Sequence, residues 1–230
     1  MKLLEDIKSV TKFERCLWLV SVSVIIITTL IFKSNNYLSI ISALLGVTSL
    51  IFVAKGLVLG QILIVIFATL YGIISIMFSY YGEMITYLFM TTPMAVISMI
   101  SWIKHPYKKT RQVEVSGIKK KQIPVLIILA AAVTFVFYFV LKLLGTANLI
   151  VSTISITTSF IAVYLSALRS PYYAVGYIAN DIVLIVLWTN AALKDTSLVP
   201  TVACFVMFLA NDAYGFYNWN RMKKKQSANM

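Results

Sequence analysis

The stretch IPVLIILAAAVTFVFYFVLKLL, residues 123–144, decides the fold class of this chain. Its only charged side chain is Lys142, and a basic stretch at residues 104–122 comes directly before it. A helix that crosses a membrane needs about 20 predominantly apolar residues. The stretch is long and apolar enough to meet that requirement by itself. The sequence therefore predicts an all-α integral membrane protein with this stretch as one of its spans.

Similar apolar runs lie on both sides of this stretch. Together with it they make eight candidate spans, at residues 17–32, 37–54, 57–80, 83–103, 123–144, 149–168, 171–193 and 197–219. Several are separated by only two to six residues, so neighbouring spans are expected to form antiparallel helix hairpins. The first run ends without a small-residue cleavage site, so we expect a retained helix rather than a signal peptide.

Composition and charge agree with a membrane protein. Of the 230 residues, 60% are hydrophobic and 12% are charged, against about 25% charged in soluble domains. The net charge of +12 does not indicate nucleic-acid binding, because the basic residues lie between the apolar runs. Counted on alternate sides, 17 Lys and Arg residues oppose Lys33, Lys142 and Lys194. The positive-inside rule then predicts a multi-pass plasma-membrane protein with both termini in the cytoplasm.

Neither a metal site nor a cofactor is expected. Cys16 and Cys204 lie in different segments without CxxC spacing, and His105 stands in the basic stretch with no Cys or His nearby. The sequence also lacks HExxH, GxSxG and phosphate-loop motifs. A membrane-embedded enzyme is therefore the weaker alternative to a transporter, and a receptor or assembly subunit is a third class.

The chain resembles itself at a shift of 114 to 117 residues. The shift pairs Lys55 with Arg169, Leu70 with Leu184, Ser75 with Thr189, Met90 with Met207, Trp102 with Trp219 and Lys104 with Arg221. So few identities also leave chance as an explanation. A genuine repeat predicts two parallel three-helix copies joined by a linking helix, a plan found in transporters that bind substrate near the midplane.

The repeat predicts five segments along the chain. Residues 1–36 hold a cytoplasmic tail and one extra helix, 37–103 the first copy, 104–148 the basic loop and linking helix, 149–221 the second copy, and 222–230 a basic tail.

Two Asn-Asp pairs interrupt the last two apolar runs. They are Asn180 with Asp181 and Asn211 with Asp212. Charged side chains inside a span are costly and often functional, and counting ~1.5 Å per residue from the run ends places both pairs at one depth. We expect the asparagines to contact a polar substrate. For the aspartates, hydrogen bonding between the two helices is an equal alternative.

Trp188 and three further polar side chains are the other candidates for substrate contact. Trp188 lies two turns from Asp181 on nearly the same helix face, where its indole could stack on a flat ring. A tryptophan of the membrane interface is the alternative. Tyr71, Tyr214 and Asn218 could add polar edges to the same cavity, although with 13 tyrosines in the chain any single one is more often a packing residue than a ligand contact.

Several strings in this chain carry a family resemblance. NDIVLIVLW at 180–188, FLANDAYGFYNW at 208–219, VAKG at 53–56, YGE at 81–83 and PM at 93–94 are similar to signatures of the PnuC-type nicotinamide riboside transporters. The resemblance implies a SWEET-like arrangement of three, one and three helices. It also implies facilitated diffusion of a ribosylated vitamin, which a separate cytoplasmic kinase traps for NAD biosynthesis. By position, Trp188 matches the family's stacking tryptophan and Asn211 its ligand-binding asparagine.

One position departs from the family pattern. Ala95 follows Pro93-Met94 where the family often has glutamine, so an amide contact to the riboside is missing. Thiamine, riboflavin and deoxynucleosides, carried by relatives of the family, therefore remain alternative substrates. The oligomeric state also stays open, with a homo-oligomer among the alternatives.

Overall fold

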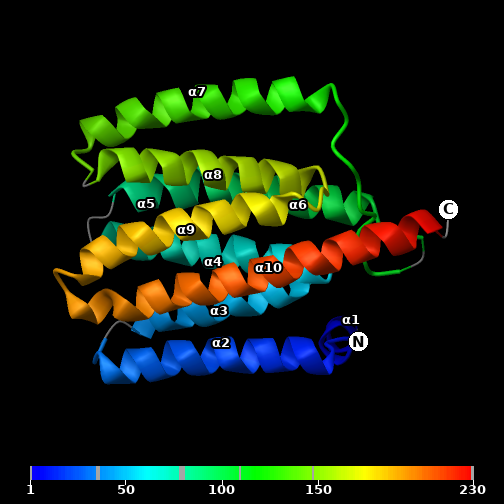
Figure 1. The fold of residues 1–230 in the computed structure, drawn as a ribbon, viewed down its shortest axis with the longest axis horizontal. Coiled ribbons are helices and arrows are strands. Elements are labelled where there is room, and N and C mark those ends of the chain that lie inside the picture. The colour runs from blue at the N-terminus through cyan, green and yellow to red at the C-terminus, as the bar shows by residue number, and fades with distance from the viewer. Residues whose placement is uncertain (1, 35–36, 78–80, 109, 147, 229–230) are drawn as a thin grey trace.

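The computed structural model describes residues 2–34, 37–77, 81–108, 110–146 and 148–228 (Figure 1). In chain order its helices are α1 (Lys2–Lys8), α2 (Lys12–Ile31), α3 (Tyr37–Ala54), α4 (Val58–Met77), α5 (Tyr81–Ile85), the π-helix η1 (Thr86–Thr91), α6 (Thr92–Lys104), α7 (Gln122–Leu143), α8 (Leu149–Ala167), α9 (Tyr173–Ala192), the 3₁₀-helix η2 (Thr196–Leu198) and α10 (Val199–Ala228). Apart from two isolated β-bridges, all regular structure in these residues is helical.

The all-helical membrane fold expected from the sequence is confirmed. Among the described residues, seven helical stretches are long and apolar enough to span a membrane, one of them the continuous Gly82–Lys104. The one remaining predicted span, residues 57–80, corresponds to α4, for which Val58–Ile73 counts as a shorter apolar helix. The count of eight spans therefore stays a prediction.

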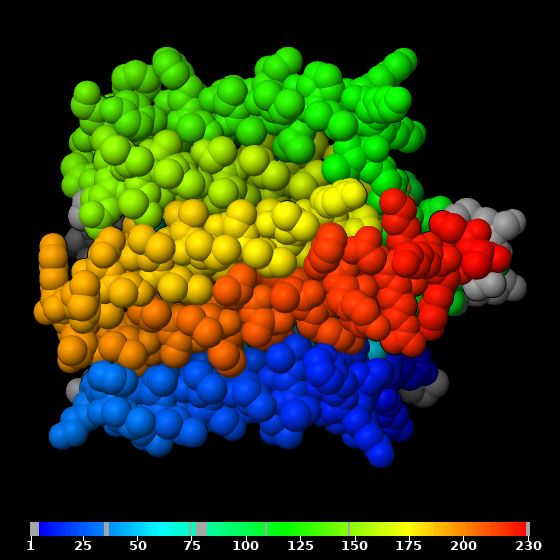
Figure 2. Space-filling model, viewed as in Figure 1, coloured from blue at the N-terminus to red at the C-terminus, as the bar shows by residue number. Residues whose placement is uncertain are grey.

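Six helical segments form a closed ring. Around it α3 packs on α4, α4 on α6, α6 on α8, α8 on α9, α9 on α10, and α10 on α3 again. The other two long helices lie outside the ring, α7 against α8 and α2 against α3 and α10. Figure 2 shows them at opposite edges of the molecule. The α7 surface is largely exposed and apolar, as a lipid-facing helix requires.

Two helices extend beyond the apolar runs that predicted them. Helix α2 starts at Lys12, because Thr11 and Glu14 form a reciprocal capping box that satisfies the first free N–H groups. Helix α10 continues to Ala228, so the expected basic tail is helical where the structure describes it. Both extensions lie at one end of the bundle, with the two termini (Figure 1).

Two glycines allow very close helix packing inside the ring. A Cβ on Gly60 would lie 2.4 Å from the Val53 backbone nitrogen, and a Cβ on Gly176 would lie 2.7 Å from Ala162 Cα. Any side chain at either position would therefore push α4 from α3 or α9 from α8. Each glycine lies near the start of its helix, at the same end of the bundle as the termini.

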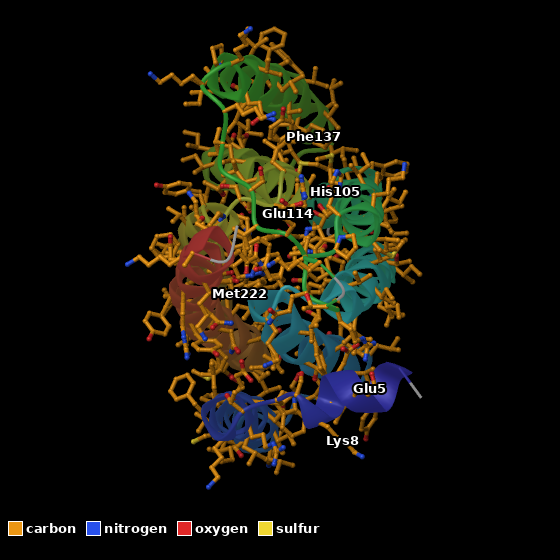
Figure 3. The ribbon with its side chains drawn as sticks, turned by 90° about the vertical axis from the view of Figure 1, so that its right-hand side faces the viewer. Glu5, Lys8, His105, Glu114, Phe137 and Met222 are labelled. Atoms are coloured by element: carbon orange, nitrogen blue, oxygen red, sulfur yellow. The ribbon has the colours of Figure 1, made fainter. Side chains whose placement is uncertain are left out.

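The segment between α6 and α7 runs across this end of the bundle (Figure 3). The Val113 N–H donates to the Gly56 carbonyl at 2.8 Å, and the Ser116 N–H donates to the Arg169 carbonyl at 2.9 Å. Gln226 of α10 accepts from the Val115 N–H at 2.7 Å. The segment thus links the α3–α4 corner, the α8–α9 corner and the end of α10.

Candidate functional site

A cavity of about 470 Å³ opens at the end of the bundle opposite the basic segment. Helices α2, α3, α4, α9, η2 and α10 all contribute to it. Its lining residues are Ile25, Thr29, Ser34, Ser39, Ile40, Ala43, Phe67, Tyr71, Ser75, Trp188, Asp195, Ser197, Leu198, Pro200, Thr201, Cys204, Phe205 and Phe208. Its volume falls within the range of about 300–1,000 Å³ that is usual for small-molecule sites.

Aromatic rings form a continuous wall of this cavity. The Phe67 ring lies 5.7 Å from that of Tyr71 and 5.8 Å from that of Phe208, and the Phe205 ring lies 5.6 Å from that of Phe208. The spacings are those of tilted and edge-to-face aromatic contacts. The wall therefore comes from α4 and α10, and Trp188 adds its indole from α9.

A glycine on α3 makes room for part of this wall. A Cβ on Gly46 would lie 2.4 Å from Cζ of Phe208 and 3.3 Å from the ring of Phe67. An alanine there would push the Phe208 ring out of its place. Gly46 thus positions the aromatic wall without lining the cavity itself.

Asp195 lies at the mouth of the cavity. Its side chain caps η2 by accepting from the Ser197 N–H at 3.0 Å. Hydrogen bonds from the Ser197 side chain and backbone hold the pKa of Asp195 below its ordinary value. Among the described residues that line the cavity, Asp195 is the only charged one, so the charge that the lining itself carries is negative.

The structure places six of the eight predicted site residues in two groups. Trp188 and Tyr71 line the cavity, and Trp188 is 6% exposed. Asn180, Asp181, Asn211 and Asp212 are all buried and do not line it. The two groups are nevertheless connected, because Asn211 follows the lining residue Phe208 by one turn of α10.

The buried polar side chains hold helices together. Asn180 accepts from Ser155 at 3.2 Å and from Thr158 at 3.0 Å, which ties α9 to α8. Asp181 of α9 and Asp212 of α10 are both buried, 2% and 3% exposed, and interact electrostatically with each other. Asp181 Oδ2 has no hydrogen-bond partner among the described residues.

Asn211 contacts the outer helix α2. Its side-chain nitrogen donates to Ser21 Oγ at 3.0 Å and to the Met207 carbonyl at 2.7 Å. Its Oδ1 is buried and has no hydrogen-bond partner within the described part of the chain. Asn211 therefore keeps one free acceptor while it attaches α10 to α2.

Tyr214 and Asn218 lie further toward the basic end. The Tyr214 hydroxyl donates to Glu14 at 2.7 Å, and Asn218 donates to the Ala54 carbonyl at 2.8 Å. Neither lines the cavity. Glu14 also pairs with Lys55 at 3.0 Å, and both side chains are nearly excluded from solvent.

Sequence reasoning missed Phe67, Phe208 and Asp195. Phe67 precedes Tyr71 by four residues and Phe208 precedes Asn211 by three, so each shares a helix face with a predicted residue. That spacing was a usable signal. No such signal pointed to Asp195, because an acidic residue in a short loop is usually only solvated.

The opposite end of the ring is closed. Trp102, Tyr173 and Trp219 are fully buried there, and the two indoles lie 5.2 Å apart. Trp102 donates to the Ser166 carbonyl and Trp219 to the Val53 carbonyl, both at 2.9 Å. The cavity therefore has an open mouth at one end and a packed aromatic floor toward the other.

Comparison with known proteins shows to which family this arrangement belongs. Residues 36–221 match the model of a family described as nicotinamide mononucleotide transporter. The chain belongs to this family. A relative from Neisseria mucosa named nicotinamide riboside transporter PnuC is 30% identical over 224 residues, which cover 94% of this chain and 84% of the relative. A protein of the same name from Haemophilus influenzae is 24% identical over 196 residues, 83% of this chain and 82% of that one.

A solved structure supports the same family. A crystal structure titled as the vitamin B3 transporter PnuC superposes with a TM-score of 0.80 at 26% identity and covers 94% of both chains. The PnuC-type resemblance seen in the sequence strings is thus confirmed. The chain is a multi-pass membrane protein of a transporter family.

Proposed function

We propose that this chain takes up nicotinamide riboside by facilitated diffusion through the plasma membrane. The observation that carries the proposal is the cavity of about 470 Å³, lined by Trp188 and the Phe67–Tyr71–Phe208 wall, in a chain whose relatives are named nicotinamide riboside transporters. An indole can stack on the nicotinamide ring, while Ser39, Ser75 and Thr201 offer hydroxyls to the sugar and amide.

The open and closed ends support alternating access. The cavity opens away from the basic segment, and the Trp102–Trp219 contact and the crossing segment close the other end. Substrate would enter from the open end and leave once the closed end separates. Phosphorylation of the riboside by a cytoplasmic kinase would trap it without ion coupling.

We propose that the open end faces outward and both termini face the cytoplasm. The charge count of 17 against 3 supports this orientation, as does the gathering of the termini and basic segment at one end. In a background without Cys16 and Cys204, a cysteine at Lys194 should react with an impermeant reagent in intact cells. A cysteine at Lys223 that reacted in intact cells while the one at Lys194 did not would reverse the orientation.

We propose eight spans, with α3, α4 and α5–α6 repeated as α8, α9 and α10. The indole hydrogen bonds support the repeat, because Trp102 reaches the end of α8 and Trp219 the end of α3. The tight crossings at Gly60 and Gly176 occupy matching places in the two halves. Helix α7 is then the linking helix and α2 the extra one.

We propose Asn211, Asp181, Asn180 and Asp212 as the deeper part of the substrate path. The free acceptors of Asn211 and Asp181 support this role, since buried polar atoms without partners are uncommon. Trp188 and Tyr71 would contact the substrate first. Tyr214 and Asn218 would not touch the substrate in the cavity. They would act by holding the closed end together, because their contacts are with Glu14 and Ala54.

A binding titration of the purified chain tests the substrate. We expect nicotinamide riboside to bind and riboflavin and deoxynucleosides to bind far more weakly, because they lack its small charged ring. Ala95, buried in α6, does not line the cavity, so its missing amide leaves the aromatic contacts intact. Saturable binding of a deoxynucleoside or riboflavin, without binding of nicotinamide riboside, would overturn this assignment.

A further inference from the structure

The charges around the cavity are distributed unequally. Asp195 lines the mouth, whereas no Lys, Arg or His is among the described residues that line the cavity. Lys33 and Lys194 belong to the same end of the bundle and are exposed, as Asp195 is, but neither lysine lines the cavity. Inside the cavity, therefore, the lining offers negative charge and aromatic faces and no cation.

Aromatic faces favour positive charge. The face of a phenyl or indole ring carries the negative part of its quadrupole, and it attracts a cation within ~6 Å, more strongly when water is excluded. The lining holds five such rings, those of Phe67, Tyr71, Trp188, Phe205 and Phe208. Four of the five, Phe67, Trp188, Phe205 and Phe208, are more than nine-tenths buried, so water screens them little.

Aromatic rings of this kind also serve purely as packing residues in membrane proteins. What separates this group from packing is the open volume that the rings enclose, together with the carboxylate at its entrance. By contrast, the aromatic contact of Phe135 with Phe139 on α7 lies on the exposed surface.

We propose that the aromatic wall and Asp195 make the cavity selective for a heterocycle with a fixed positive charge, so that it discriminates against neutral rings of the same shape. The inference rests on the proposed function and narrows its substrate class. In nicotinamide riboside the sugar is attached to the ring nitrogen, which makes the ring a pyridinium cation. Its 1,4-dihydro form keeps the sugar and the amide but is neutral.

This pair of compounds gives the sharpest test. Titrated into the purified wild-type protein, the dihydro form should bind at least tenfold more weakly than the cation. Equal affinity for the two forms would overturn the inference, because shape, sugar and amide are shared and only charge and ring planarity differ. Thiamine, a thiazolium cation, should likewise bind more tightly than neutral riboflavin.

The same titrations separate failure of this inference from failure of the proposed function. If thiamine binds and nicotinamide riboside does not, the proposed substrate is wrong while selection for positive charge stands. If nicotinamide riboside and its dihydro form bind equally, the proposed substrate stands and charge selection fails. If no cation binds, both fail.

A variant locates the selectivity in the wall. Phe208→Leu keeps an apolar side chain but removes a ring face, so it should weaken binding of the cation several-fold and leave the dihydro form unchanged. Phe160→Leu, which replaces a buried ring outside the cavity, is the matched control and should change neither affinity. An unchanged ratio of the two affinities in folded Phe208→Leu protein would remove this ring from the selective wall.

A second variant tests the mouth. Asp195→Asn keeps an oxygen that can cap η2, so the fold of the loop should survive. Binding of the cation should weaken and become less dependent on salt, because the charge that attracts it is lost. Wild-type affinity and wild-type salt dependence in this variant would exclude Asp195 from the mechanism.

Discussion

Trp188→Ala is expected to weaken binding of nicotinamide riboside at least tenfold. The indole is 6% exposed and lines the cavity. Stacked aromatic rings contribute roughly 0.5–1.5 kcal/mol beyond the area they bury, and the missing indole also removes apolar contact. A loss of ~1.4 kcal/mol corresponds to a factor of ten in affinity. Calorimetric titration of the purified variant measures the change.

Trp18→Ala is the matched control for this substitution. Trp18 of α2 donates to Thr48 at 3.0 Å and does not line the cavity. Its loss should lower thermal stability and leave the affinity unchanged. A folded Trp188→Ala protein with wild-type affinity would show that Trp188 is a packing or interface tryptophan, and the cavity would lose its principal contact.

Glu14→Leu is expected to destabilise the protein strongly. Glu14 and Lys55 form a buried ion pair, with side chains 2% and 10% exposed, and Lys55 also donates to the Ser9 carbonyl. Removing one partner of a buried pair leaves an uncompensated charge and costs roughly 3–5 kcal/mol. The Tyr214 hydroxyl loses its acceptor as well. A lower thermal unfolding temperature in detergent is the expected result.

The double variant Glu14→Leu with Lys55→Met should recover much of that loss, since replacing both charges with apolar groups is often close to neutral. The Arg169–Glu114 pair provides the contrast, because Glu114 is 46% exposed and the charges lie 3.7 Å apart. Glu114→Gln should therefore change stability by less than about 1 kcal/mol. An unfolding temperature in Glu14→Leu equal to that of Glu114→Gln would contradict the buried-pair account.

Much of the architecture could be predicted because lipid imposes a simple rule on sequence. Backbone groups in hydrocarbon must pair within the segment, so each span reads as a long apolar run. The long helices α7, α8 and α9 begin and end within about four residues of the runs that predicted them. The basic segment was likewise placed at the end of the bundle that holds both termini.

The helix ends were less predictable. Helix α2 begins before its apolar run because of the Thr11–Glu14 capping box, which is a side-chain effect that hydropathy does not record. In the sequence, Glu14 is one of several charged residues that precede the first apolar run. In the structure it is one of the contacts that join α2 to the end of α3 and to α10, through Lys55 and Tyr214.

The candidate site was predictable only in part. Trp188 could be found from its spacing to Asp181 on one helix, since that relation is local. The hydrogen-bond partner of Asn211 could not be predicted, because Ser21 is 190 residues away and belongs to a helix outside the ring. The wall formed by Phe67 and Phe208 also depends on packing between α4 and α10, which no local pattern encodes.

Uptake of labelled nicotinamide riboside into proteoliposomes tests the central claim most directly. Because the substrate is a cation, the membrane potential is held at zero throughout; we then expect saturable entry that stops when the inside and outside concentrations are equal and that does not change when a proton or sodium gradient is applied. With Trp188→Ala protein reconstituted to the same density, uptake at low substrate concentration should approach its plateau far more slowly. Entry no faster than into protein-free liposomes, or accumulation above the outside concentration only under an ion gradient, would contradict facilitated diffusion through this cavity.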